Sequence, residues 1–292
     1  MRRQWYVSAV LGVITACGGE APLSAEHPMD QTLRIDQLQA LGTHNSYHVE
    51  PIDNTLVDWR YSHLPLARQL DEQGVRKVEL DVYYDPQTRG FHVLHIGLVD
   101  DRTTCETLAL CLAEMRSWSD EHRGHHPIFV MIEPKTAYSE TRAEAMLTDL
   151  DRVVAEAMSG GRIITPAEVR GEHETLRDAI VQKGWPSLAQ GRGRFIFWMD
   201  DWANWASDYS LELTSLDHRQ LFVVSPLDAP IAAITNMNDP IGSASAIREA
   251  VAQGFIVRTR ADGPALALAG DDNQLKAALA SGAQLISSDF PA

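Results

Sequence analysis

Basic residues are scarce in this chain of 292 residues: 25 Lys and Arg stand against 40 Asp and Glu, for a formal net charge of −15. A nucleic-acid partner requires a basic surface that displaces counterions, so this charge balance argues against one. It argues equally against electrostatic attraction to an anionic membrane. Cysteine is scarce as well, with three residues and no C-x-x-C spacing, so a zinc site is not expected.

Two of the cysteines, Cys105 and Cys111, are six residues apart. Within one helix their side chains would point about 240° apart, so a disulfide requires one of them outside the helix. Thr103 followed by Glu106 is typical of a capping box, which would place Cys105 in the first helical turn. The sequence therefore leaves two alternatives open, a disulfide and a pair of buried thiols.

The third cysteine follows a short apolar stretch near the amino terminus. Arg2 and Arg3 precede apolar residues 7–16, a pattern that predicts a signal peptide over residues 1–16, too short to span a bilayer. Ile14–Cys17 resembles a lipobox, so we expect Cys17 to be lipidated in an exported bacterial lipoprotein of the cell envelope. The alternative is an ordinary secretory signal with an incidental cysteine.

Residues 17–31 contain two adjacent glycines, two prolines and no apolar period, and they predict a flexible tether. A single domain over residues 32–292 is expected to follow. It contains no short internal repeat and no low-complexity segment.

Short β-branched apolar runs alternate in this domain with longer stretches of helical spacing. The runs predict eight strands, at Leu38–Thr43, Val75–Asp81, Phe91–His95, Ile128–Glu133, Arg194–Met199, Leu221–Val224, Phe255–Arg260 and Gln284–Ser288. Helices are predicted between them at Thr107–Glu121, Glu140–Met158, Ala244–Gln253 and Asn273–Ala280.

This alternation favours an α/β fold of the (β/α)8 TIM-barrel type, with its chemistry at the carboxyl ends of the strands. The alternative is an open doubly wound sheet. Polar residues follow consecutive strands, and their side chains converge on one mouth only if the sheet curls into a barrel.

Four of these polar residues offer oxygen ligands: Asn45, Glu79, Asp81 and Glu133. Glu79 and Asp81 alternate along one strand and therefore share a face, which is costly for two like charges unless a cation or a proton intervenes. A hard cation such as Ca²⁺ prefers oxygen ligands and tolerates irregular geometry, whereas zinc would recruit histidines. The pattern predicts a calcium site, although a lone carboxylate at a strand end is more often a solvated rim residue.

Several ungapped segments together resemble the bacterial Ca²⁺-dependent phosphoinositide phospholipase C family, also called phosphatidylinositol-specific. The resemblance runs from Leu38 to the carboxyl terminus. It is carried by Leu41–Tyr47, Glu79–Asp81, His92–Gly97, Ile132–Lys135, Phe255–Asp262 and Gly282–Asp289.

The resemblance implies a phosphodiesterase that cleaves phosphatidylinositol-type lipids to diacylglycerol and a cyclic inositol phosphate. It assigns Ca²⁺ to Asn45, Glu79, Asp81 and Glu133. It makes His95 the acid that protonates the departing glycerol oxygen and His44 the residue that stabilises the phosphorane. A carboxylate of the ligand set, Glu133 or Asp81, could take the proton of the attacking hydroxyl. From the residues alone, the roles of the two histidines could be exchanged.

An anionic diester also requires positive partners, and Lys135, Arg258 and Arg260 are the candidates for substrate binding. The alternative is that each of them pairs with one of the many carboxylates. The enzyme is expected to act as a monomer on a phospholipid substrate at a membrane surface.

Two other functions are alternatives to this one. A glycerophosphodiester phosphodiesterase would share the barrel and the chemistry, but it would carry His-Arg-Gly and Glu-Asn motifs after the first strand, which this chain lacks. A non-catalytic anchored barrel that binds a phosphorylated ligand would be expected to lack part of the histidine and carboxylate set, and none is missing.

Overall fold

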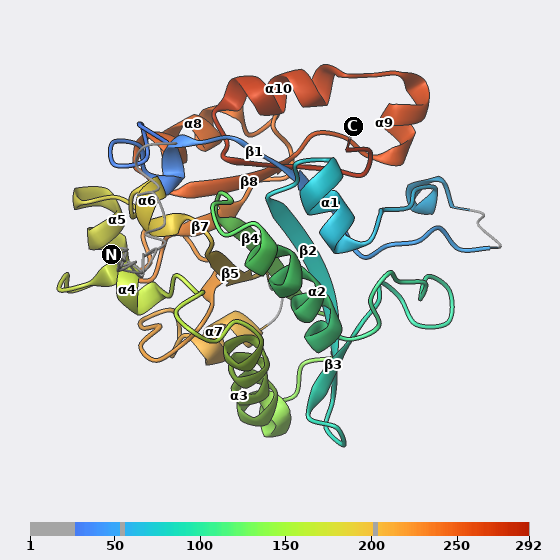
Figure 1. Ribbon diagram of the computed structural model, residues 1–292, viewed down its shortest axis with the longest axis horizontal. Helices are drawn as coiled ribbons and strands as arrows, with labels where there is room; N and C mark the ends of the chain where they lie inside the picture. Colours follow the sequence, from blue (N-terminus) through green and yellow to red (C-terminus); the bar gives the residue numbers. More distant parts are fainter. Residues whose placement is uncertain (1–26, 53–55, 201–203, 292) are drawn as a thin grey trace, which may run out of the picture.

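A computed structural model describes residues 27–52, 56–200 and 204–291 (Figure 1). Cys17, the predicted signal peptide and most of the predicted tether lie outside the described residues. Eight parallel strands form the centre of the molecule: β1 (Ala40–Thr43), β2 (Lys77–Asp85), β4 (Ile128–Pro134), β5 (Phe195–Met199), β6 (Phe222–Val223), β7 (Ile234–Asn236), β8 (Ile256–Arg260) and β9 (Leu285–Ser288).

The strands follow one another in the order β6-β5-β4-β2-β1-β9-β8-β7. A parallel bridge between Val224 and Ile234 joins the two ends of this path, so the sheet closes on itself. The (β/α)8 prediction is confirmed, and the open doubly wound sheet is excluded. Closure brings the carboxyl ends of all eight strands to one mouth.

One of the predicted barrel strands is wrong. The segment predicted at Phe91–His95 forms β3 (Gly90–Val93), which pairs antiparallel with β2 and lies outside the barrel. Only residues 86–89 connect β2 to β3, and a parallel crossover needs about a dozen residues or more, so the connection is a hairpin. The eighth barrel strand is β7, a three-residue strand that the sequence analysis missed.

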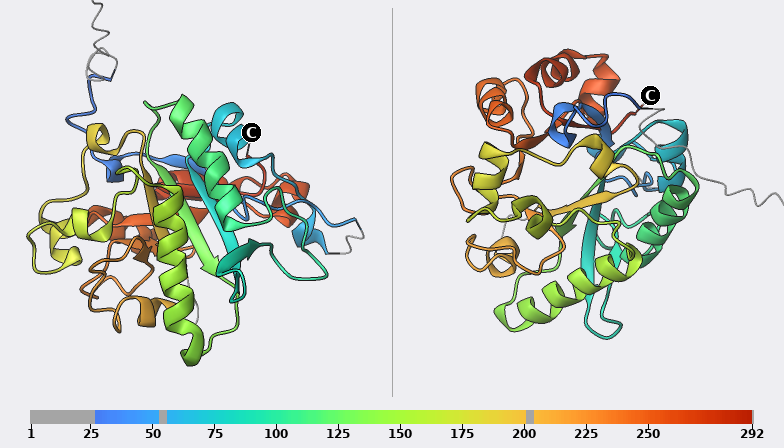
Figure 2. Two further views of the ribbon diagram at one scale, coloured as in Figure 1. Left: turned by 60° about the horizontal axis from the view of Figure 1, so that its bottom comes forward. Right: turned by 60° about the vertical axis from the view of Figure 1, so that its left-hand side comes forward.

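All four predicted helices are present, as α2 (Leu108–Glu121), α3 (Glu140–Ala157), α8 (Ala244–Ala252) and α10 (Asn273–Ser281). Figure 2 shows the helices arranged around the outside of the strands. The remaining helices are α1 (Leu66–Glu72), α4 (Pro166–Arg170), α5 (Leu176–Gln182), α6 (Leu188–Gly191), α7 (Trp205–Tyr209) and α9 (Pro264–Ala269), with 3-10 turns η2 (Ile35–Gln37) and η3 (Val57–Trp59).

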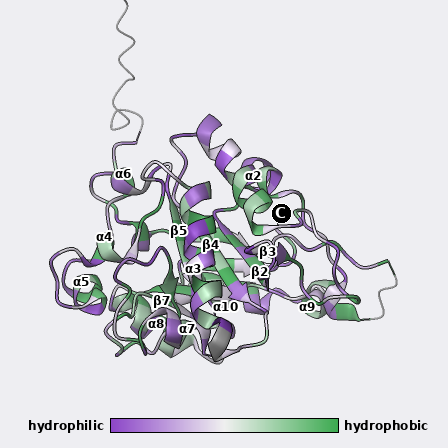
Figure 3. Ribbon diagram, turned by 90° about the horizontal axis from the view of Figure 1, so that it is seen from below, coloured by the Kyte–Doolittle hydropathy of each residue, from purple (hydrophilic) through white to green (hydrophobic). Residues whose placement is uncertain are grey.

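Strand residues alternate between the barrel interior and the helix-covered exterior. On β2, Leu80 is fully buried in the apolar core, while Glu79 and Asp81 face inward. The helices carry both hydrophobic and hydrophilic stretches in Figure 3, because each buries one face and exposes the other. Among the described residues, no helix has both the length and the apolar character needed to cross a bilayer.

Cys105 and Cys111 form a disulfide, which settles the alternative that the sequence left open. The residue that caps α2 is Thr107, whose side chain accepts a hydrogen bond from the backbone of Leu110. The predicted capping box at Thr103 is therefore wrong, and Cys105 lies before the helix. This placement meets the geometric requirement that one cysteine stands outside the helix.

Candidate active site

The mouth of the barrel contains a cavity of about 410 Å³. Its wall is built by the loop after β1, the loop after β3 and the ends of β8 and β9. Figure 1 shows the β1–α1 loop, the loop after β3 and α9 extending from the same side of the barrel. Five polar residues of the wall are His44, Asn45, His95, Arg260 and Asp289.

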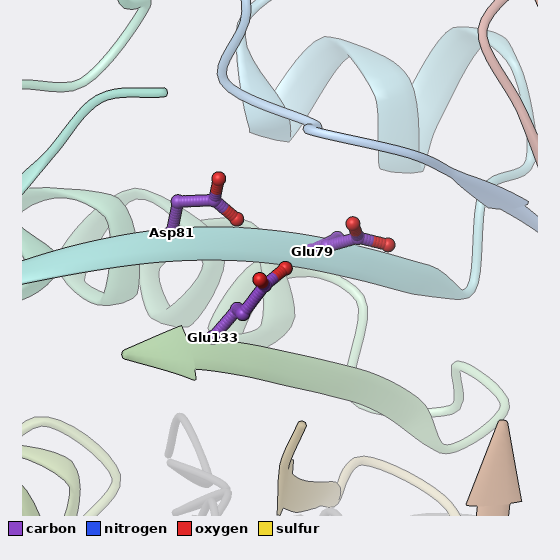
Figure 4. A group of neighbouring side chains, drawn as sticks. All are labelled: Glu79, Asp81 and Glu133. Carbon is purple, nitrogen blue, oxygen red and sulfur yellow. The ribbon is translucent and has the colours of Figure 1, made fainter. Parts of the chain in front are cut away.

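Three of the predicted metal ligands cluster beside this cavity. Glu79, Asp81 and Glu133 each offer a carboxylate oxygen, and these oxygens lie within 4.8 Å of one another. Figure 4 shows Glu79 and Asp81 projecting from the same side of β2, with Glu133 reaching toward them from β4. The strand register explains the proximity, because Asp81 pairs directly with Glu133.

Of the three carboxylates, Asp81 is the one whose two oxygens both lack a hydrogen-bond donor of good geometry in the described part of the chain. Both of its carboxylate oxygens are buried, and neither accepts a hydrogen bond of good geometry among the described residues, although Lys135 Nζ lies 3.3 Å from Oδ2. Burial, together with the negative charge of Glu133, raises the pKa of Asp81 well above its ordinary value. A divalent cation would offset the free-energy cost of burying the charged carboxylate. A buried carboxylate beside another carboxylate therefore indicates a ligand position.

Glu79 is held by two buried cations. Its Oε2 lies 2.5 Å from Lys77 Nζ and 2.8 Å from Arg258 Nη2. Burial would raise the pKa of Glu79, but the charges of Lys77 and Arg258 outweigh it and hold the pKa below its ordinary value. Lys77 fits inside the barrel because residue 42 is glycine: a Cβ there would lie 2.7 Å from Lys77 Cδ.

The fourth predicted ligand, Asn45, is buried and lines the same cavity. Its neighbour Ser46 fixes the loop to β2, since Ser46 N donates to Glu79 O at 3.0 Å and Glu79 N donates to Ser46 Oγ at 2.7 Å. Asn45 has a φ of +43°, a conformation that asparagine tolerates better than most residues. Three clustered carboxylates and a neighbouring amide fit Ca²⁺ in ligand chemistry, and Asn45, Glu79, Asp81 and Glu133 would hold it.

The three predicted substrate-binding cations are all paired with carboxylates. Lys135 Nζ lies 2.5 Å from Glu133 Oε1 and 3.3 Å from Asp81 Oδ2. Arg258 is 2 % exposed and does not reach the cavity wall, because its guanidinium is used by Glu79 and by two polar neighbours, Asn238 and Ser287.

His44 is paired with a residue for which the sequence analysis assigned no role. Its Nδ1 donates to Asp289 Oδ1 at 2.7 Å, and its Nε2 lies 3.6 Å from Glu79 Oε1. Arg260 Nη2 donates to the other oxygen of Asp289 at 2.8 Å. Burial lowers the pKa of His44, although the charges of Glu79 and Asp289 act in the opposite direction.

Asp289 follows β9, so the same reasoning that identified the other strand-end residues could have found it.

His95 reaches the cavity from the β3 hairpin and not from a barrel strand. Tyr83 Oη donates to His95 O at 2.9 Å and anchors the segment, while the edge of Trp59 packs against the imidazole. His95 Nδ1 donates to Asp100 Oδ2 at 2.6 Å. Asp100 lies in an irregular loop, and no pattern in the sequence indicated its role.

The comparisons with known proteins agree with this geometry. Residues 33–89 and 87–292 match the family model described as phosphoinositide phospholipase C, Ca²⁺-dependent. Among curated protein sequences, none matches the chain.

Solved structures show the same fold at low identity. The calcium-dependent phosphoinositol-specific phospholipase C of a Pseudomonas species, in its myoinositol complex, has a TM-score of 0.69 at 20 % identity, over 93 % of this chain and 95 % of that one. The enzyme of Streptomyces antibioticus has a TM-score of 0.66 at 19 % identity, over 88 % and 95 % of the two chains. The Listeria monocytogenes phosphatidylinositol-specific phospholipase C has a TM-score of 0.57 at 14 % identity, over 90 % and 91 %.

The family match covers nearly all of the described chain, and the carboxylate cluster provides the metal chemistry that the family requires. This chain therefore belongs to the Ca²⁺-dependent phosphoinositide phospholipase C family, whose members are phosphodiesterases with Ca²⁺ as cofactor.

Proposed function

We propose that this protein cleaves phosphatidylinositol at a lipid surface, with His44 as the proton acceptor and His95 as the proton donor. One observation carries the proposal: two histidines, each paired through Nδ1 with a carboxylate, line one cavity beside three clustered carboxylates. The pairing leaves the Nε2 atom of each imidazole available to the reacting groups.

The reaction transfers phosphorus from one oxygen to another. The inositol 2-hydroxyl oxygen bonds to phosphorus, its proton passes to His44 Nε2, and the bond between phosphorus and the glycerol oxygen breaks. His95 Nε2 gives a proton to that oxygen, which releases diacylglycerol and leaves a cyclic inositol phosphate. When bound, Ca²⁺ supplies charge neutralisation at the phosphate and makes the hydroxyl more acidic.

This assignment gives His44 a different role from the one that the resemblance implies. Asp289 accepts the proton of Nδ1, and burial lowers the pKa of His44, so the neutral imidazole with a lone pair at Nε2 is favoured. An acceptor of the hydroxyl proton needs such a lone pair.

The surface around the mouth favours a lipid over a soluble diester. Leu98, in the loop that carries His95, is 96 % exposed, and Leu268 on α9 is 67 % exposed. Leu56 beside η3 is also exposed, and η3 contacts α9. Exposed apolar side chains on neighbouring mouth elements suit insertion into a lipid layer, which offsets the lack of basic charge.

The test is cleavage of phosphatidylinositol in detergent micelles, with Ca²⁺ or with a chelator, by the protein and its His44→Ala and His95→Ala variants. We expect an inositol phosphate that disappears on chelation and in both variants. A substrate analogue with a thiol leaving group needs no proton donor, so it should restore turnover to His95→Ala and not to His44→Ala. Cleavage of soluble glycerophosphodiesters without cleavage of the lipid would overturn the proposal.

We also propose that the protein is exported and anchored through Cys17. The disulfide between Cys105 and Cys111 suits an oxidising compartment, and it leaves Cys17 without a cysteine partner in this chain. Cell fractionation tests the anchor: Cys17→Ser should move the protein from the membrane fraction to the soluble exported fraction. Membrane association that persists in Cys17→Ser would exclude the lipid anchor, and a soluble exported wild type would indicate an ordinary secretory signal.

A further inference from the structure

We propose that Asp100 is the positioning residue of His95 and that the buried imidazole of His48 holds Asp100 in place. The proposal rests on the proposed function in one respect, the role of His95 as proton donor to the glycerol oxygen. Neither Asp100 nor His48 lines the cavity, so both would act through His95.

Asp100 is completely buried, and its two carboxylate oxygens are used by two different imidazoles. Oδ1 lies 2.8 Å from His48 Nε2, and Oδ2 lies 2.6 Å from His95 Nδ1. Burial works against the charged carboxylate, but the hydrogen bonds from the two histidines outweigh it and hold the pKa of Asp100 at about 2. The residue is therefore an ionised acceptor at neutral pH.

The partners of His48 determine where its protons are. Its Nδ1 lies 3.0 Å from the backbone oxygen of Tyr61, which can only accept, so Nδ1 carries a hydrogen. Its Nε2 lies 2.8 Å from Asp100 Oδ1, so both ring nitrogens have a partner. The His48 ring is also stacked on the Tyr61 ring at a centroid distance of 4.2 Å, so the buried imidazole is fixed by three contacts and holds Asp100 in place.

The contact with Asp100 fixes the tautomer of His95. Its Nδ1 hydrogen is committed to Asp100, so neutral His95 has its lone pair at Nε2, and a second proton can be held only there. The carboxylate also stabilises the imidazolium that a proton donor must form. With a quarter of its side chain exposed at the cavity, His95 has the position and the protonation site that the leaving glycerol oxygen requires.

The pair also connects the two loops that carry the site. His48 follows Asn45 on the loop after β1, and Asp100 follows His95 on the loop after β3. Backbone contacts join the same loops, because His48 pairs with Thr103 and Thr104 N donates to Tyr47 O at 2.8 Å. The His48–Asp100 pair therefore sets the position of the proton donor relative to the loop of the predicted metal-binding amide.

The first experiment is Asp100→Asn, with Asp101→Asn as the matched control, since Asp101 is the exposed neighbour. An amide cannot accept from both imidazoles, so the kcat for phosphatidylinositol should fall about 100-fold to 1,000-fold. KM should stay within about threefold, and Asp101→Asn should resemble the wild type. The substrate with a thiol leaving group should restore turnover, because it needs no proton donor.

An unchanged kcat would overturn the proposal, and so would an equal loss with both substrates, which indicates a structural role. If Asp100→Asn does not fold, the proposal is tested on the wild-type protein. Nitrogen NMR of ¹⁵N-histidine-labelled protein should show neutral His95 protonated at Nδ1, and protonation at Nε2 would overturn the proposal. This measurement needs no activity, so it separates failure of the positioning role from failure of the proposed function.

Discussion

His44 Nδ1 donates to Asp289 Oδ1 at 2.7 Å, which connects the loop after the first barrel strand to the end of the last. The contact depends on the pairing of the first and last barrel strands: β1 and β9 pair in register from Ala40 and Leu285 to Thr43 and Ser288. The two residues are 245 positions apart in the chain. Their pairing gives His44 the same arrangement that Asp100 gives His95.

Asp289→Asn should therefore impair catalysis through His44. An asparagine here has one acceptor oxygen in place of the two that accept from His44 and Arg260, and it has no charge to stabilise the protonated imidazole, so we expect kcat to fall about 100-fold to 1,000-fold. The thiol-leaving-group substrate should not restore turnover, in contrast to Asp100→Asn. Asp228→Asn, at an exposed position, is the control and should be unaffected. Restoration by the thiol substrate would contradict the assignment of His44 as proton acceptor.

Asp81→Asn should affect calcium binding and stability in opposite directions. The change removes a buried carboxyl group whose pKa is raised by burial and by the charge of Glu133. The free energy of unfolding of the calcium-free protein should therefore rise by about 1 kcal/mol, or roughly 2–4 °C in Tm. The rise in Tm that Ca²⁺ produces in the wild type should disappear, and calorimetric titration should detect no high-affinity binding. A variant that still gains stability from Ca²⁺ would exclude Asp81 as a ligand.

Lys135→Met should strengthen calcium binding. Its ammonium contacts both Glu133 and Asp81, so it competes with a cation for the same oxygens. We expect the Kd for Ca²⁺ to fall about tenfold, or about 1.4 kcal/mol. Lys183→Met is the control, because that lysine is exposed and far from the cluster in the sequence. A rise in KM for the lipid in the same variant would indicate that Lys135 also contacts the substrate phosphate. An unchanged or weaker affinity for Ca²⁺ would contradict the competition.

Mild acid should destabilise the protein through buried histidines, of which His125 is one. Burial lowers the pKa of His125 from 6.5 to about 4, so folding favours its neutral form. Its contribution is fully present above pH 6.5 and is lost as the pH falls toward 4. Between pH 7 and pH 5 the loss should be about 2 kcal/mol.

Urea unfolding at the two pH values measures this loss, and His125→Asn should reduce the difference between them. His218→Asn is the control, because His218 is exposed and its φ of +66° suits asparagine. A pH dependence in His125→Asn equal to that of the wild type would show that other groups are responsible.

Residues at strand ends could be predicted from the sequence, and residues that depend on loops could not. The alternation of side chains along a strand predicts that Glu79 and Asp81 share one face, and the structure confirms that they lie together. The partners of Arg258 could not be predicted, because its contact with Glu79 spans 179 residues and depends on strand register and barrel closure. Asp100 lies in an irregular loop, and its contact with His48 joins residues 52 positions apart in the chain, which no local pattern indicates.

β3 shows the limit of composition as a guide to strands. Its residues favour a strand, and they form one, but the short connection from β2 makes it a hairpin outside the barrel. Counting connection lengths along with apolar runs would have excluded it from the barrel. β7 would still have been missed, because a strand of three residues has too few positions to show alternation.

Leu98→Asn should separate lipid binding from stability. Leu98 is 96 % exposed with a φ of +73°, a backbone conformation that costs leucine about 1 kcal/mol and that asparagine tolerates better. The variant should therefore be as stable as the wild type or slightly more stable. Loss of one inserted leucine should lower vesicle binding about tenfold, since burying the side chain is worth roughly 1.5–3 kcal/mol.

Leu211→Asn is a matched control, because Leu211 is also exposed with positive φ and does not line the mouth cavity. Binding to vesicles is measured by co-sedimentation, and cleavage is compared between vesicles and a short-chain phosphatidylinositol below its micelle concentration. We expect Leu98→Asn to lose activity on vesicles alone, while Leu211→Asn keeps both activities. Equal vesicle binding by the two variants would mean that the loop after β3 does not enter the lipid, and that the apolar side chain of Leu98 has another partner.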